Sequence, residues 1–170
     1  MVPGKLDILS MLRVLAAHET EFIVVGGVAA AINGAPISTY DLDIVHRRTP
    51  ANIVRLLTAL DELDAHSRVH SDRLIKPDTT HLASQGHVLL MTRSGALDLL
   101  GTIGAGRGYE ELLPHTTRND VSHGLMVSVL DLVTLIEIKE ETGQDKDNAV
   151  LPILRATLRE RSRLGSGGGQ

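Results

Sequence analysis

The sequence predicts an α+β fold in which a central mixed β-sheet is flanked by helices and followed by C-terminal helices. Three observations predict it: apolar residues recur at helical spacing in several segments, short β-rich runs lie between these segments, and no internal repeat or long linker interrupts the 170 residues. We expect one domain over residues 1–164, with the sheet core in about 1–128 and the C-terminal helices in 129–164. Residues 165–170, mostly glycine, are expected to form a flexible tail.

The composition excludes several classes of protein. The chain carries 17 Lys and Arg against 21 Asp and Glu, a net charge of −4, and it contains no cysteine. The lack of cysteine excludes disulfides and Cys-ligated metals and favours a cytoplasmic location. One Phe and two Tyr are too few for an aromatic platform that stacks bases. No apolar run approaches the ~20 residues of a membrane-spanning helix, and the acidic net charge argues against binding to a DNA duplex.

The first part of the chain alternates helical and β patterns. Leucines three residues apart predict a helix from Leu6 to about His18, and the apolar run 21–25 is typical of a strand buried on both faces. A short helix is expected over 28–32. Polar and apolar residues then alternate at period two through the strand 38–45. The next helix begins at Pro50, which fits the first turn, and ends near Leu63.

The second part of the chain shows weaker and stronger β signals before it becomes helical. Ser128 is expected to cap a helix, since Asp131 follows it at the spacing of a capping motif. The expected elements are a weak strand at 73–75, strands at 87–92 and 96–100, a mobile glycine-rich loop at 101–108, a hairpin over 121–127 with its turn at His123-Gly124, and helices over 130–141 and 146–164.

Two aspartates on one strand are the most informative feature. Asp41 and Asp43 stand at positions i and i+2 of the strand 38–45, so their side chains project from one face while Leu42 turns into the core. Carboxylates this close repel each other, and a shared proton, a basic partner or a divalent cation relieves the repulsion. Oxygen ligands favour Mg²⁺ or Mn²⁺. A solvated strand face is the alternative explanation of the pair.

The glycine pair Gly26-Gly27 supplies the other half of a candidate site. Without side chains, its backbone N–H groups can approach phosphate oxygens at the start of the helix that follows. A plain turn is the alternative. Together with the two aspartates, the pair predicts a site for a metal ion and a triphosphate.

These motifs resemble the polymerase-β-type nucleotidyltransferase superfamily, in which a Gly-Gly or Gly-Ser turn precedes an Asp-x-Asp strand. Here the motif is Gly26-Gly27 followed by Thr39-x-Asp41-Leu42-Asp43-Ile44. Segments at 52–60, 130–139 and 143–147 are also similar to small bacterial nucleotidyltransferase-like proteins, including the AbiEii-like and MenT-like toxins of toxin–antitoxin pairs. The likeness spans about residues 20–155 and implies the nucleotidyltransferase fold.

The resemblance implies a metal-binding and catalytic role for Asp41 and Asp43, because the superfamily uses these two aspartates to bind Mg²⁺ with the nucleoside triphosphate. A third carboxylate on a neighbouring strand completes the site in the superfamily. Our candidate is Asp98, the only acid inside the apolar run 96–100, where an ionised side chain is costly without a partner. A polar strand end or an ion-pair partner is the alternative for Asp98.

The same resemblance implies that Gly26, Gly27 and Thr39 bind the nucleotide and that Lys139 and Lys146 approach its phosphates. Solvated helix faces are the alternative for the two lysines. Relatives often carry Gly-Arg-x-Lys-Asp where this chain has Gln144 at the arginine position. That departure puts the strength of phosphate neutralisation, and hence of catalysis, in question.

The function expected is Mg²⁺-dependent transfer of a nucleoside monophosphate from a nucleoside triphosphate (NTP) to an acceptor hydroxyl. The acceptor is an RNA such as a tRNA 3′ end, a protein side chain or a small molecule, and the resemblance suggests a toxin with a cognate antitoxin protein. A second hypothesis is a catalytically weak or inactive domain that binds nucleotide or a partner. A third is metal-dependent hydrolysis of a phosphoester by the same carboxylates.

Overall fold

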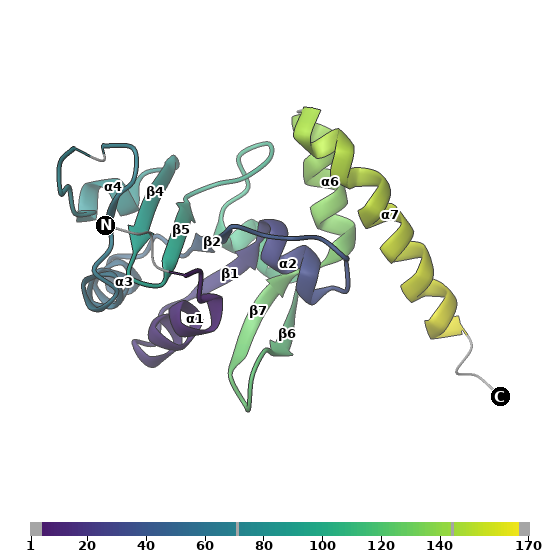
Figure 1. Ribbon diagram of the computed structural model, residues 1–170, viewed down its shortest axis with the longest axis horizontal. Coiled ribbons are helices and arrows are strands. Elements are labelled where there is room, and N and C mark those ends of the chain that lie inside the picture. Colours follow the sequence, from purple (N-terminus) through teal and green to yellow (C-terminus); the bar gives the residue numbers. More distant parts are fainter. Residues whose placement is uncertain (1–4, 71, 144, 167–170) are drawn as a thin grey trace.

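The computed structural model describes residues 5–70, 72–143 and 145–166, and within them the chain forms a seven-stranded mixed β-sheet flanked by helices (Figure 1). The strand order is β3-β4-β5-β2-β1-β7-β6. The α+β fold class expected from the sequence is confirmed. The assignment of 1–164 to a single domain stays a prediction.

The bounds of the elements follow the chain. The strands are β1 (Phe22–Val25), β2 (Asp41–His46), β3 (His66–Ser67), β4 (His87–Thr92), β5 (Gly95–Leu100), β6 (Thr116–Asp120) and β7 (Met126–Leu130). The helices are α1 (Ile8–Ala17), α2 (Gly26–Ile32), α3 (Pro50–Glu62), α4 (Thr79–Ala83), α5 (Tyr109–Leu112), the 3-10 helix η1 (Leu113–His115), α6 (Leu132–Thr142) and α7 (Asp145–Ser166).

Strands β1, β2 and β5 form the middle of the sheet. Strand β1 pairs with β2 in antiparallel orientation and with β7 in parallel orientation, whereas β2 and β5 are parallel neighbours. Every residue of β1 is buried, which agrees with the continuous apolar run in the sequence. Helices α6 and α7 lie together at one end of the molecule, and α3 and α4 lie together at the other (Figure 1).

Side-chain caps fix where several helices begin. Asp7 accepts a hydrogen bond from the backbone N–H of Ser10 at 3.0 Å at the start of α1. At α6 the cap is Asp131, whose carboxylate accepts from the N–H of Thr134 at 2.8 Å. The expected cap at Ser128 is wrong, because Ser128 lies within β7, and α6 therefore begins two residues later than expected.

Several expected boundaries are corrected by the structure. Helix α2 begins at Gly26 rather than at Val28. Residues 73–75 do not form the expected strand, and the strand that pairs with β4 in this part of the chain is β3, at His66–Ser67. The last hairpin has its strands on either side of 121–125 instead of within 121–127. Gly165 and Ser166 of the expected tail belong to α7, and residues 167–170 lie outside the described residues.

The glycine-rich loop 101–108 packs against α6. Ile103 and Arg107 form an isolated antiparallel bridge, and the Arg107 guanidinium forms an ion pair with Glu141 of α6. Gly104 lies against Ile138 and Glu141 of the same helix. The loop is thus joined to the C-terminal helices by both charge and packing.

One buried polar side chain joins the start of β1, the end of β2 and the start of α3. Asn52 is fully buried, its Oδ1 accepts from the N–H of Glu21 at 2.7 Å, and its Nδ2 donates to the carbonyls of Glu21 and Arg47 at 2.9 and 2.8 Å. One amide therefore makes three hydrogen bonds to the backbone between elements, and the carbonyl of Glu21 also accepts from the N–H of Arg47 at 3.1 Å.

Replacing Asn52 with alanine is expected to lower the free energy of unfolding by about 2–4 kcal/mol, because it removes three buried hydrogen bonds and leaves the N–H of Glu21 and the carbonyl of Arg47 without that partner. Urea denaturation followed by circular dichroism measures the change. The control is Asn148→Ala, since Asn148 is exposed on α7 and should tolerate the change within about 0.5 kcal/mol. Equal stabilities of the two variants would contradict the role assigned to Asn52.

None of the helices in the ranges that the structure describes combines the length and the apolar character needed to cross a membrane.

Candidate metal and nucleotide site

Three carboxylates converge where β2 and β5 run side by side. Asp41 and Asp43 are the first and third residues of β2, and the parallel register places Asp98 of β5 opposite Asp43. One carboxylate oxygen of each residue lies within 4.8 Å of the others. Leu42 and Ile44 point to the opposite face and are fully buried. Strand pairing thus brings together the three acids that the sequence singled out.

Gly26 lies tightly against Asp43. Its φ is +65°, and a Cβ added there would overlap Oδ2 of Asp43 and come within 3.1 Å of the Cβ and Cγ of the same residue. Only glycine combines this left-handed conformation with so close an approach to a carboxylate. A Cβ on Gly27 would meet Thr39 at 3.3 Å. The structure therefore brings the glycine pair to the acidic cluster, whereas phosphate binding by Gly26 and Gly27 stays a prediction.

Thr39 shapes the entry of the chain into β2. Its hydroxyl donates to the carbonyl oxygen of Asp41 at 2.8 Å, which holds the residue just before the two aspartates in a fixed turn. The proposed contact of Thr39 with a nucleotide stays a prediction.

The carboxyl of Asp43 holds its proton more tightly than an ordinary aspartate. Burial, the negative charges of Asp41 and Asp98 and a side-chain hydrogen bond with Asp98 together raise the pKa of Asp43 to about 7, while the positive charge of Arg68 acts in the opposite direction. A divalent cation would remove this electrostatic penalty, because it would supply positive charge among the three carboxylates.

Arg68 adjoins the cluster and was not singled out in the sequence. It follows β3, and its Nη1 lies 2.6 Å from Oδ1 of Asp98 while donating to the carbonyl of Leu90 at 2.9 Å. Oδ1 of Asp98 is buried and lacks a well-directed hydrogen bond among the described residues. The two groups form a close ion pair, and this contact with Asp98 raises the pKa of Arg68. A lone arginine in a polar loop carries no sequence signal that could have identified it.

The two candidate lysines lie on the C-terminal helices. Lys139 is half-buried in the last turn of α6. Lys146 lies near the start of α7, but its side chain is outside what the structure describes, as is Gln144. Phosphate binding by Lys139 and Lys146 stays a prediction.

The residues present fit a divalent cation such as Mg²⁺ or Mn²⁺. Asp41, Asp43 and Asp98 offer three oxygen ligands from two neighbouring strands, and oxygen ligands suit these ions. Oδ1 of Asp98 is buried, and the close approach of Gly26 holds the carboxylate of Asp43 where a side chain on any other residue would displace it.

The free energy of unfolding of the metal-free protein is expected to fall by on the order of 2 kcal/mol between about pH 5 and pH 8 because of Asp43. Its pKa is higher in the folded chain than the ordinary value of 3.8, so the folded state binds more protons across this range and loses that advantage as the pH passes about 7.

Urea denaturation in EDTA at several pH values measures this dependence, with Asp43→Asn as the reference variant. The comparison cancels the opposite effect of His46, whose pKa is lowered by burial and which destabilises the fold as the pH falls below its ordinary value of 6.5. Parallel curves for the two proteins would show that Asp43 titrates normally.

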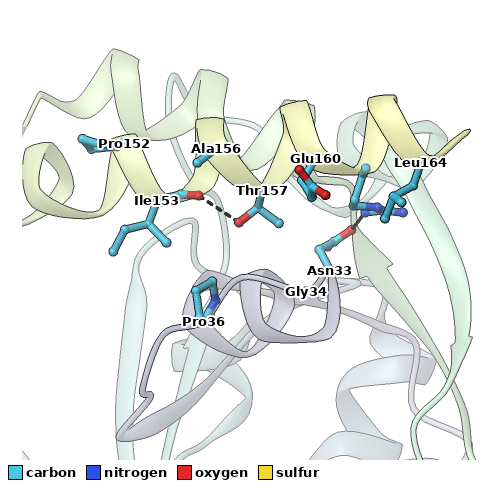
Figure 2. Close-up of a pocket in the computed structure, with 10 residues that line it drawn as sticks. Asn33, Gly34, Pro36, Pro152, Ile153, Ala156, Thr157, Glu160 and Leu164 are labelled. Atoms are coloured by element: carbon cyan, nitrogen blue, oxygen red, sulfur yellow. Dashed lines mark hydrogen bonds between the residues drawn. The ribbon is translucent and has the colours of Figure 1, made fainter. Parts of the chain in front are cut away.

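A large groove lies elsewhere in the molecule. It has a volume of about 770 Å³ and separates α7 from the end of α2 and the chain that follows it (Figure 2). Arg161 donates to Oδ1 of Asn33 at 2.7 Å across it, and Ile153 and Leu164 contribute apolar surface. None of the three clustered carboxylates lines this groove, so its size alone does not identify the site of chemistry.

Comparisons with known proteins address the fold. No protein-family model matches the sequence, and no curated protein matches it. Among solved structures, the chain is similar to a crystal structure from Thermotoga maritima described as "a putative nucleotidyltransferase (TM1012)", with a TM-score of 0.55 and 15% sequence identity over 90% of this chain and 91% of that one. At this identity the likeness concerns the fold. The chain therefore adopts a nucleotidyltransferase fold, with its acidic cluster on two central strands of the sheet.

Proposed function

We propose that the protein is a divalent-metal-dependent nucleotidyltransferase that moves a nucleoside monophosphate from an NTP to an acceptor hydroxyl. The observation that carries the proposal is the convergence of Asp41, Asp43 and Asp98 within 4.8 Å, beside Gly26, in a chain with this fold. A cytoplasmic toxin that is controlled by an antitoxin protein belongs to the same proposal, and it is supported by the resemblance to AbiEii-like and MenT-like proteins.

Asp41, Asp43 and Asp98 would hold Mg²⁺ or Mn²⁺, which when bound lowers the pKa of a hydroxyl nucleophile and neutralises phosphate charge. The chain itself contributes the orientation of these carboxylates, because the register of β2 and β5 fixes their spacing. One of the aspartates would also accept the proton of the acceptor hydroxyl.

The remaining candidate residues would act on the triphosphate. Gly26 and Gly27 lie at the start of α2 beside Asp43 and Thr39, and their backbone N–H groups would bind phosphate oxygens. Lys139 and Lys146 would neutralise charge on the triphosphate or on the departing pyrophosphate. The acceptor is an RNA, a protein side chain or a small molecule.

A second candidate function is binding of nucleotide or of a partner with weak or no turnover. The specific observation that favours it is the contact between Arg68 and Asp98, which engages one of the three carboxylates with a positive charge of the protein itself. The glutamine at position 144, where relatives often carry arginine, is in keeping with weak catalysis.

The test is incubation of the purified protein with each labelled NTP, Mg²⁺ or Mn²⁺, and whole-cell RNA or protein extract. We expect a labelled acceptor and released pyrophosphate. Both should be lost in Asp41→Asn and retained in the control Asp61→Asn, which changes an exposed position of α3. Bound NTP without pyrophosphate release would favour the binding domain. Free nucleoside monophosphate or inorganic phosphate without a labelled acceptor would favour hydrolysis.

A further inference from the structure

Arg68 has an anchored backbone and a movable side chain. Its backbone N–H donates to the carbonyl of Leu89 at 3.0 Å, which fixes the residue beside β4, whereas about 28% of its side chain is exposed. Leu89 pairs with Asp98 in the antiparallel register of β4 and β5. The guanidinium therefore reaches Asp98 from the neighbouring part of the sheet, and it can turn toward solvent without opening a cavity in the core.

The contact of Arg68 with Asp98 compensates the charge of the carboxylate, while the same nitrogen is shared with a backbone carbonyl. Nη1 lies 2.6 Å from Oδ1 of Asp98, yet this oxygen has no well-directed donor, and the same nitrogen donates to the carbonyl of Leu90. A residue that positions a carboxylate normally does so through directed, often bidentate hydrogen bonds. The geometry is that of a counter-ion for the carboxylate cluster.

We propose that Arg68 is an internal counter-ion that competes with the divalent cation for Asp98. This inference rests on the proposed function, since it concerns the same carboxylates. A guanidinium and a divalent cation that approach one buried carboxylate repel each other, so the side chain of Arg68 has to leave Asp98 when the cation binds. Arg68 thus stabilises the metal-free protein and weakens its affinity for the cation.

Titration calorimetry with Mn²⁺ alone, without nucleotide, tests the proposal at pH 8. Removal of the charge in Arg68→Met is expected to tighten Mn²⁺ binding about tenfold. Arg68→Lys keeps the charge and should bind within about twofold of the wild type. The matched control is Arg73→Met, an exposed arginine of the same loop, which should leave the affinity unchanged. Arg68→Gln repeats the test if Arg68→Met does not fold.

If Arg68 only supported the structure or positioned Asp98, its truncation would weaken Mn²⁺ binding. Unchanged or weaker Mn²⁺ binding by both Arg68→Met and Arg68→Gln therefore overturns the proposal. If the wild type binds Mn²⁺ and Asp43→Asn does not, the metal site of the proposed function stands whatever Arg68 does. If neither the wild type nor the neutral Arg68 variants bind Mn²⁺ more tightly than Asp43→Asn, both proposals are wrong. Binding by the neutral variants alone would support the competition strongly.

Discussion

Replacing Asp43 with asparagine is expected to reduce nucleotidyl transfer by about 10³-fold or more while stabilising the metal-free protein at pH 8. The amide keeps the shape of the side chain but removes the charge that a cation and the transferred proton both require. It also removes a carboxylate that burial and two neighbouring acids make costly to ionise, as the pKa of about 7 indicates. Opposite changes in activity and stability are typical of a residue kept for function.

The measurement combines kcat/KM in the labelled transfer assay with the midpoint of thermal unfolding in EDTA. The control is Asp61→Asn, since the carboxylate of Asp61 is exposed and forms a surface ion pair with Lys76. That variant should leave both quantities near those of the wild type. An Asp43→Asn protein that is fully active would remove Asp43 from the site, and one that is less stable at pH 8 would show that its carboxylate contributes to the fold.

Replacing Gly26 with alanine is expected to lower activity by about 100-fold and the free energy of unfolding by about 1–3 kcal/mol. The new Cβ would overlap Oδ2 of Asp43, so the carboxylate must move away from its position in the cluster. The backbone adds to the cost, because a φ of +65° is unfavourable for every residue with a Cβ.

The control for Gly26→Ala is Gly124→Ala in the turn between β6 and β7. Gly124 also has a positive φ, of +87°, but nothing lies within 4 Å of an added Cβ. The Gly124→Ala variant should lose stability because of the backbone strain and should keep its transferase activity. Comparison of kcat/KM and of Mn²⁺ affinity in the two variants separates backbone strain from displacement of Asp43. Equal activities would mean that the carboxylate adjusts without cost.

The carboxylates were predictable because their signals are local and physically simple. Period two places Asp41 and Asp43 on one face of a strand, and the structure buries Leu42 on the other face. Asp98 was predictable from the energetic cost of burying an ionised side chain, since an acid within an apolar strand needs a partner. Pattern alone does not supply the register that sets Asp98 opposite Asp43, because nothing in either strand specifies which neighbour it pairs with.

The parts that were missed depend on tertiary contacts or on weak patterns. Arg68 has no periodicity, and its importance comes only from reaching across to Asp98. Strand β6 is a polar edge strand with mostly exposed side chains, so it lacks the alternation that identifies strands with one buried face. Strand β3 has two residues and is defined entirely by pairing with β4. The contact of Gly26 with Asp43 requires the relative placement of two elements.

The parallel pairing of β2 with β5 also determines which changes in chain length the cluster can tolerate. Asp43 and Asp98 belong to adjacent strands, and 54 residues connect them along the chain. Their distance in space depends on the hydrogen bonds between the two strands and not on the length of that connection. Insertions or deletions in the exposed connections within that stretch should alter what reaches the acids while leaving the acids themselves in place. Related chains could therefore acquire new acceptors by remodelling their loops, without rebuilding the chemistry.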